Sequence, residues 1–184
     1  MKFINTKIAD LIIIEQTVFA DKRGYFFESY NQKKFDEVVG KTSFVQDNES
    51  KSSKGVLRGL HFQKPPFAQA KLVRCIKGRV IDVAVDIRKG SPTYGRHVSV
   101  ELSEENKRQL FIPRGFAHGF AVLSNTAVFA YKVDNIYAPK FDCGIKYNDK
   151  DLNIDWSLGK NEVKLSAKDD NLSSFKDLDS PFKL

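Results

Sequence analysis

The sequence predicts a mainly β protein built as a sandwich or a barrel. Residues 109–112, 118–123 and 127–133 form short runs rich in β-branched and aromatic side chains, and they follow one another at close, regular intervals. Residues 80–87 alternate strictly, which is typical of a strand with one face in the core. The apolar side chains that share this face are Ile81, Val83, Val85 and Ile87.

The first half of the chain contains the helix that the sequence predicts most clearly. Residues 11–19 and 25–30 are expected to be strands, with a turn signal at residues 21–24 between them. A helix should follow, because Asn31 is a suitable cap, apolar residues recur at helical spacing, and Gly40 is a typical stop.

The elements around the alternating strand are predicted by their composition. Residues 44–48 are a strand candidate and residues 50–54 a polar connector. Residues 72–76 form a strand that the turn at residues 77–79 links to the alternating strand, and residues 97–102 form another. Near the end of the chain, Ser166 and Asp169 have the spacing of a helix-capping box.

Composition limits the architecture and the partner. With 184 residues, 41% of them hydrophobic, residues 1–184 are expected to form a single domain with a substantial core. The net charge of +7 favours an anionic partner. Basic residues are interleaved with 23 acidic ones, which argues against a dedicated nucleic-acid arm, so a nucleotide diphosphate fits better.

The cysteines and the N-terminus bear on the compartment. Cys75 and Cys143 have neither the CxxC spacing nor a zinc pattern, which predicts a reduced cytosolic protein. The apolar run at residues 11–14 stops at Glu15 and is too short for a signal core or a membrane span. We therefore expect a cytoplasmic protein with no membrane partner.

One stretch, residues 55–66, combines groups that can do chemistry. It contains His61 and Arg58, and Lys71 follows shortly afterwards. An imidazole can accept a proton at neutral pH, and neighbouring cations can stabilise negative charge on a substrate. Arg58 and His61 are three residues apart, so both can enter one pocket only if the backbone is irregular near Gly59. The alternative is a short strand with solvated cations and a space-filling histidine.

Four motifs carry a resemblance to a known family. They are GVLRGLHFQ at residues 55–63, KLVR at 71–74, ENKRQLFIPRGFAHGF at 105–120 and YAPKFDCGI at 137–145. In this order they resemble the dTDP-4-dehydrorhamnose 3,5-epimerase family of cupin-fold sugar epimerases, from the Phe19 region to Asp169. The resemblance implies a cupin jelly roll with a few short helices, a homodimer, and an isomerase of dTDP-L-rhamnose biosynthesis that uses no cofactor.

The resemblance also implies catalytic roles. His61 is the base that removes protons next to the C4 ketone of dTDP-4-dehydro-6-deoxy-D-glucose, and Lys71 meets the enolate oxygen. Tyr131 returns a proton on the opposite face, so that C3 and C5 are inverted and dTDP-4-dehydro-L-rhamnose forms. Asp169 orients the base, although the assignment could fall on Asp170 and helix capping would also account for Asp169.

Binding residues follow from the same motifs. The arginines suit diphosphate oxygens, Phe19 can stack on thymine, and Asp142 stands where the family usually has Glu, so a nucleotide contact there would be longer or absent. A two-residue turn at Ser124-Asn125 would place His118 across from Tyr131 in a hairpin, whereas a three-residue turn would separate them. The implied substrate-binding residues are Phe19, Arg23, Glu28, Gln46, Asn48, Arg58, Lys71, His118, Asp142 and Lys168.

Metal-binding cupins carry two motifs, and only one is intact here. Residues 113–118 match Pro-x-Gly-x-x-His, but Gln63 stands where the first motif needs a second histidine after His61. With His118 as the only other ligand in those slots, no metal site is expected. The remaining alternatives are a single-carbon epimerase or ketoisomerase of a related nucleotide 4-ketosugar, a non-catalytic cupin that binds sugar or nucleic acid, and a metal-dependent cupin.

Overall fold

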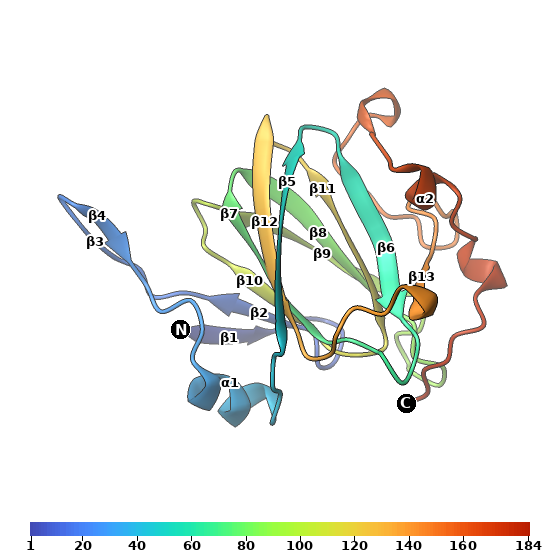
Figure 1. The fold of residues 1–184 in the computed structure, drawn as a ribbon, viewed down its shortest axis with the longest axis horizontal. Coiled ribbons are helices and arrows are strands. Elements are labelled where there is room, and N and C mark those ends of the chain that lie inside the picture. Colours follow the sequence, from blue (N-terminus) through green and yellow to red (C-terminus); the bar gives the residue numbers. More distant parts are fainter.

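Two antiparallel sheets face each other across the core of the protein (Figure 1). This computed structural model describes residues 1–184 and confirms the prediction of a mainly β jelly roll. In order across the six-stranded sheet lie β1 (Lys2–Asn5), β2 (Ile12–Glu15), β10 (Gln109–Ile112), β7 (Lys71–Lys77), β12 (Thr126–Val133) and β5 (Gln46–Ser53). The five-stranded sheet contains β13 (Asp142–Gly144), β6 (Leu57–Gln63), β11 (Phe116–Val122), β8 (Arg79–Asp86) and β9 (His97–Ser103).

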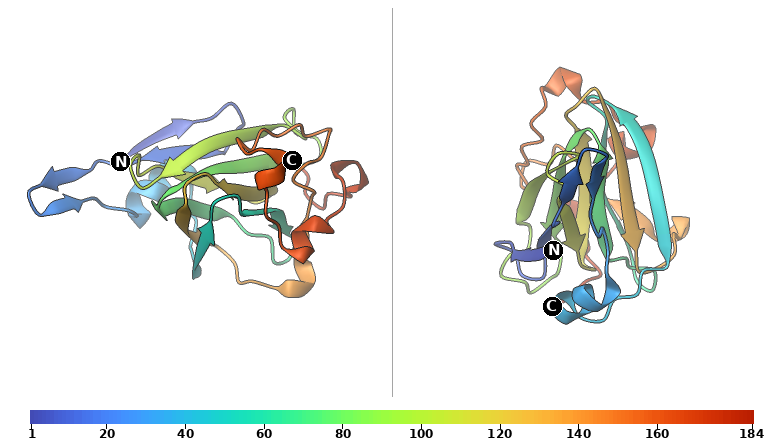
Figure 2. Two further views of the ribbon diagram at one scale, coloured as in Figure 1. Left: turned by 90° about the horizontal axis from the view of Figure 1, so that it is seen from above. Right: turned by 90° about the vertical axis from the view of Figure 1, so that its left-hand side faces the viewer.

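The remaining elements lie outside the two sheets. A hairpin of β3 (Phe19–Asp21) and β4 (Gly24–Phe26) projects away from the body of the molecule, as Figure 2 shows from above. The helix predicted after it is present as α1 (Gln32–Val39), where the Asn31 side chain accepts a hydrogen bond from the Lys34 backbone N–H. The later helices are short: η1 (Pro139–Phe141), η2 (Lys160–Glu162), α2 (Ala167–Asp170) and η3 (Phe175–Asp177).

Two strand predictions in the first half were wrong. The expected strand at residues 11–19 is split between β2 and β3, and the one at residues 25–30 is reduced to β4. The expected polar connector at residues 50–54 is also wrong, because β5 continues to Ser53 and pairs with β12 along its whole length. As an edge strand, β5 keeps many of its polar side chains in contact with solvent, so no apolar alternation marks it in the sequence.

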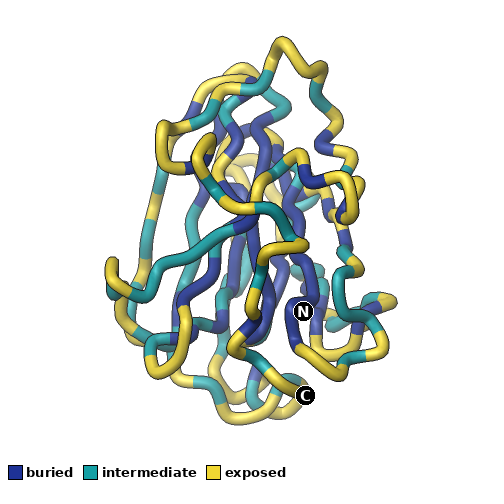
Figure 3. The backbone as a smooth tube through the Cα atoms, turned by 90° about the vertical axis from the view of Figure 1, so that its right-hand side faces the viewer, coloured by how far each residue is buried: buried dark blue, intermediate teal, exposed yellow.

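Strand β8 is buried on both faces rather than on one. Val80 and Ala84 pack in the core between the sheets. Val83 and Val85 pack on the outer side against a second cluster that includes Ile145, which follows β13. In Figure 3, which looks onto the side of the C-terminal segment, the buried strands lie beneath this more exposed outer layer. The C-terminal segment therefore completes the fold and also reaches the site described below.

Two expected hairpins are crossings between the sheets. The turn at Gly78 leads from β7 in one sheet to β8 in the other, and the turn at residues 124–125 leads from β11 back to β12. The turns pack against each other, since the Arg79 backbone N–H donates to Ser124 Oγ at 2.8 Å. Gly78 has φ +78°, and a Cβ at this position would lie 2.1 Å from the Thr126 carbonyl oxygen.

Candidate active site

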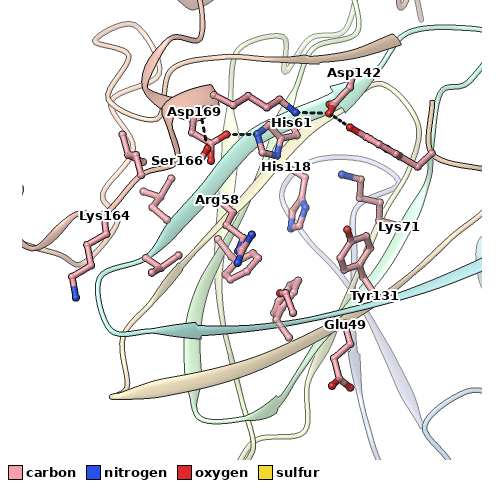
Figure 4. Close-up of a pocket in the computed structure, with 18 residues that line it drawn as sticks. Glu49, Arg58, His61, Lys71, His118, Tyr131, Asp142, Lys164, Ser166 and Asp169 are labelled. Carbon is pink, nitrogen blue, oxygen red and sulfur yellow. Dashed lines mark hydrogen bonds and ion pairs between the residues drawn. The ribbon is translucent and has the colours of Figure 1, made fainter. Parts of the chain in front are cut away.

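A cavity of about 530 Å³ opens between the two sheets and the C-terminal segment (Figure 4). Both sheets contribute polar side chains to its wall, and α2 closes one side. Six of the predicted site residues line it: Arg58, His61, Lys71, His118, Tyr131 and Asp169.

A bulge in β6 brings Arg58 and His61 into the same cavity. His118 pairs with His61 and Phe120 with Arg58, so three steps along β6 oppose two steps along β11. Gly59 lies in this irregular stretch with φ +129°, and a Cβ there would lie 2.5 Å from the Cα of Gly119. The predicted irregularity at Gly59 is thus confirmed.

The imidazole of His61 is paired with the carboxylate of Asp169. The distance between His61 Nε2 and Asp169 Oδ1 is 2.5 Å, and the carboxylate is almost fully buried. Burial acts to raise the pKa of Asp169, but the hydrogen bond to His61 outweighs it with the help of neighbouring groups and keeps this pKa below its ordinary value. Asp170 is exposed, so the structure brings Asp169 rather than its neighbour to the histidine.

Asp169 also serves the helix start that its sequence predicts. Its backbone N–H donates to Ser166 Oγ at 3.1 Å, which caps α2. The backbone and the side chain of this residue therefore do different things. Local capping fixes the position of the helix start, and the carboxylate is left free to reach His61.

Lys71 and Tyr131 extend from the sheet opposite His61. They are diagonal neighbours on one face, because Val133 pairs with Lys71 and Tyr131 pairs with Val73. The Lys71 ammonium forms no hydrogen bond or ion pair within the chain. Burial lowers the pKa of Lys71 to about 8, and the negative charges of Asp142 and Asp82 oppose this shift. Burial likewise raises the pKa of Tyr131.

His118 comes from β11 in the five-stranded sheet. The hairpin expected to set it across from Tyr131 is wrong, since the two residues lie in different sheets. They nevertheless line the same cavity because the sheets face each other. His118 Nε2 lies 2.9 Å from Asp82 Oδ2, and burial lowers the pKa of His118 although Asp82 opposes the shift.

The other predicted binding residues fall into two groups. Asp142 binds the Lys168 ammonium and accepts a hydrogen bond from the Tyr137 hydroxyl at 2.9 Å, and both acid and lysine line the cavity. Gln46 and Asn48 line an adjoining cavity of about 260 Å³, which shares Lys71 and Tyr131 with the first.

Phe19, Arg23 and Glu28 do not reach the cavity of their own chain. The first two lie on the projecting hairpin, where the Phe19 residue is 64% exposed and Arg23 binds Asp21 at 2.6 Å. Glu28 instead forms an ion pair with Lys34 at 2.8 Å. The structure therefore does not bring these three residues to the cavity of their own chain, because β3 and β4 extend away from the sheets.

Several residues of the site were missed from the sequence. Tyr137 belongs to the motif at residues 137–145, but nothing in its sequence context indicated a role in the site. Asp82 could have been found, because an acid between apolar residues in the middle of a buried strand calls for a partner. Ser52 accepts hydrogen bonds from Arg58 at 3.2 and 3.3 Å and lay in the segment taken for a connector.

The cupin metal positions are occupied by other interactions. His61 Nε2 and His118 Nε2 each contact a carboxylate. No group of three or more His, Cys, Asp or Glu side chains in the chain is arranged to hold a metal ion.

No helix combines the length and the apolar character that a membrane crossing requires.

The fold and the site define a cupin-type enzyme with a paired imidazole, an ammonium and a phenol around one cavity. Residues 5–177 match the family model described as dTDP-4-dehydrorhamnose 3,5-epimerase. The chain belongs to this family of isomerases.

Individual relatives agree with the family match. The chain is 58% identical over 180 residues to a dTDP-4-dehydrorhamnose 3,5-epimerase of Shigella flexneri, covering 97% of this chain and 98% of the relative. A Legionella pneumophila epimerase solved with dTDP-4-keto-L-rhamnose is 52% identical, with a TM-score of 0.93 and coverage of 97% and 94%. A 3'-monoepimerase of Streptomyces bikiniensis, in complex with dTDP-quinovose, is 30% identical, with a TM-score of 0.86 and coverage of 92% and 85%.

Proposed function

We propose that this chain inverts C3 and C5 of dTDP-4-dehydro-6-deoxy-D-glucose and so forms dTDP-4-dehydro-L-rhamnose. The observation that carries the proposal is the His61–Asp169 pair, which faces Lys71 and Tyr131 across one cavity. The names of the relatives that cover nearly the whole chain support the same reaction.

His61 acts as the base in this proposal. Its Nε2 is engaged by Asp169, so the other ring nitrogen accepts the proton from the carbon next to the ketone. The ring becomes an imidazolium, which the carboxylate stabilises and keeps in one orientation. The electron pair left by the C–H bond moves onto the C4 oxygen and forms an enolate.

Lys71 stabilises the enolate oxygen. Its ammonium has no partner in the chain and is held in a partly buried position, where an electrostatic interaction with a developing anion is stronger than in water. The ketone and this cation together provide the means of stabilising the carbanion. The proposed route therefore needs neither a metal nor an organic cofactor.

Tyr131 returns a proton to the opposite face of the same carbon. It lies on β12, whereas His61 lies on β6 in the facing sheet, so a sugar between them has a base on one side and an acid on the other. Transfer of the phenolic proton inverts the carbon, and solvent then restores the phenol. Turning the ring so that the second carbon reaches the base repeats the sequence.

The nucleotide part of the substrate meets cationic and amide groups. Arg58, oriented by Ser52, and Lys168 are suited to the diphosphate. Gln46 and Asn48 offer amides in the adjoining cavity.

We place the reaction in the cytoplasm, where both cysteines would stay reduced, since both are free thiols here.

Heavy water tests the reaction directly. Purified protein is incubated with dTDP-4-dehydro-6-deoxy-D-glucose in deuterated water, and the product is followed by proton NMR. Loss of the C3 and C5 proton signals in heavy water, together with the couplings of the L-sugar in a parallel reaction in ordinary water, supports the proposal. No exchange at all would favour a non-catalytic cupin.

A single-carbon epimerase is the second candidate. The observation that favours it is the monoepimerase neighbour, whose structure aligns over 92% of this chain. Its identity of 30% is well below the 58% of the 3,5-epimerase relative, which is why we rank it second. Deuterium at one carbon only would establish this reading.

We further propose that two copies form a homodimer through the β3–β4 hairpin. This hairpin exposes apolar side chains, among them Phe19 at 64% and Phe26 at 70%, and a second copy would cover them. Arg23 and Phe19 cannot meet a nucleotide in the cavity of their own chain, so their family-implied roles require the cavity of the partner copy. Light scattering after size exclusion measures the oligomeric state.

A further inference from the structure

Asp82 is a fully buried carboxylate behind the cavity. It lies in the middle of β8 between apolar residues and has no exposed surface. A charge in such a place is costly unless a specific partner or a function compensates for it. It does not line the cavity, so it cannot contact a substrate.

The carboxylate has one partner and one free oxygen. Asp82 Oδ2 lies 2.9 Å from His118 Nε2, whereas Oδ1 is buried and has no hydrogen-bond partner. The second buried acid of β8, Asp86, is different, because Arg88, Ser91 and Thr93 all donate to it. The incomplete pairing is therefore particular to the acid that lies beneath the cavity.

Two residues that line the cavity interact with Asp82. His118 is in direct contact with Asp82, and Lys71 lines the same cavity as His118, where the negative charge of Asp82 favours its charged form. We propose that Asp82 is a positioning residue that fixes the tautomer of His118 and supplies the counter-charge for Lys71. This inference deepens the proposed function and rests on it.

The tautomer follows from the chemistry of the contact. A carboxylate can only accept, so His118 donates through Nε2–H, and a neutral ring then has an unprotonated Nδ1. Burial, which lowers the pKa of His118, favours this neutral form. His118 would thus accept a hydrogen bond from a sugar hydroxyl in the cavity. It would not act as a second acid.

The counter-charge acts on Lys71. The charged groups that influence this ammonium are Asp142, Asp82 and Lys168, while His61, His118 and Tyr131 are further titratable groups around the same cavity. Asp142 is already engaged by Lys168 and Tyr137. Asp82, with its free oxygen, is the acid that supports the charged state of Lys71 without a competing cation.

The substitution Asp82→Asn tests the role in turnover. Asparagine keeps the shape and can still accept from His118, but it removes the charge. We expect kcat to fall about 10–100-fold, as for other residues that orient a functional group without touching the substrate themselves. The alkaline limb of kcat/KM should move down by about 0.5–1 pH unit, because Lys71 then loses its proton more readily. The Kd for dTDP should change less than about twofold.

A matched control separates this role from stability. Asp86→Asn removes the other buried acid of β8, and Val83→Ala provides a milder destabilisation of the same strand if that variant does not fold. Either control should lower the melting temperature and leave the position of the alkaline limb unchanged. If Asp82→Asn lowers only the melting temperature, as the controls do, Asp82 is structural and the proposal is wrong.

The tautomer is measured on the unmodified protein. Ring nitrogen-15 shifts of the three histidines, assigned with His97→Gln and His61→Asn, should show His118 protonated at Nε2 and bare at Nδ1. A charged ring or the Nδ1–H tautomer would overturn the proposal. This readout does not depend on turnover, so failure of the proposed reaction and failure of the inference can be told apart.

Discussion

His61 and Asp169 are 108 residues apart in the sequence, yet His61 Nε2 and Asp169 Oδ1 are 2.5 Å apart in the structure. The histidine comes from β6, and its partner comes from a four-residue helix in the C-terminal segment. The C-terminal segment therefore contributes a residue to the proposed active site as well as side chains to the core.

Removal of either member of this pair should lower turnover while leaving nucleotide binding intact. We expect His61→Ala to reduce kcat at least about 10³-fold and Asp169→Asn about 10²-fold, because the first removes the proton acceptor and the second its orientation and charge. Single-turnover kinetics and dTDP titration by calorimetry measure both. Asp170→Asn is the matched control and should retain wild-type kcat. Equal losses for the two aspartate variants would contradict the assignment.

The pH dependence should follow Lys71. Its ammonium must be charged to stabilise the enolate, and burial lowers its pKa to about 8, so kcat/KM should fall as the pH rises above about 8. In Lys71→Arg the guanidinium stays charged, so residual activity should not fall until Tyr131, whose pKa burial raises, loses its proton. A pH profile from 6 to 10.5 checks this. A fall near pH 8 that persists in Lys71→Arg would assign the limb to another group.

Tyr131→Phe should separate exchange from inversion. Without the phenol, His61 can still remove a proton and return one from the same side. We expect inversion to slow about 10²-fold or more, while deuterium enters the recovered starting sugar. Proton NMR distinguishes labelled substrate from product. If exchange and inversion fall together, Tyr131 is needed before or during deprotonation.

The residues that line the cavity could be predicted from the sequence better than the way in which the strands assemble around it. The spacing of Arg58 and His61 predicted an irregular backbone near Gly59 if both residues share a pocket, and the structure has a bulge there. The crossing turns at Gly78 and Ser124 could not be told from hairpins, since a short turn has the same composition in both cases. The sheet to which a strand belongs depends on long-range pairing, which local patterns do not encode.

Polar segments and distant partners were the other limit. The edge strand that ends at Ser53 looks like a loop because solvent contact permits polar residues in it. Asp169 carried a capping signal that accounts for its backbone alone, and only the fold shows where its carboxylate points. Pairings of this kind depend on the tertiary structure. The local pattern gives only the residue type, and it was the family resemblance that assigned Asp169 to His61.

Gly59 should be intolerant of a side chain. A Cβ would lie 2.5 Å from Gly119 Cα and 2.8 Å from the His118 carbonyl oxygen, so Gly59→Ala must displace β6 from β11. We expect the free energy of unfolding to fall by about 2–4 kcal/mol, with loss of activity. Denaturant unfolding measures this. The control is Gly90→Ala, which also has a positive φ but no atom within 4 Å of the added Cβ, and it should cost less and stay active. Equal costs would mean that backbone strain dominates over the close approach.

The projecting hairpin leads to a prediction about two copies. If Arg23 serves the cavity of the partner copy, Arg23→Ala and His61→Ala should each be poorly active alone. Mixed dimers would contain one complete site, which combines an intact cavity from one chain with an intact hairpin from the other. After unfolding and refolding together in equal amounts, half of the dimers are mixed, so about a quarter of wild-type activity should return.

The alternative arrangement gives a different result in the same experiment. If the hairpin folded back onto its own cavity, a mixed dimer would contain no complete site, and the activity would stay at the mean of the two variants. Mixing Lys71→Met with His61→Ala is the control, because both defects lie in the cavity of a single chain and no combination of copies repairs them. Recovery only in the Arg23 mixture would mean that the hairpin acts on the partner, whereas recovery in both mixtures would point to exchange of a larger part of the chain.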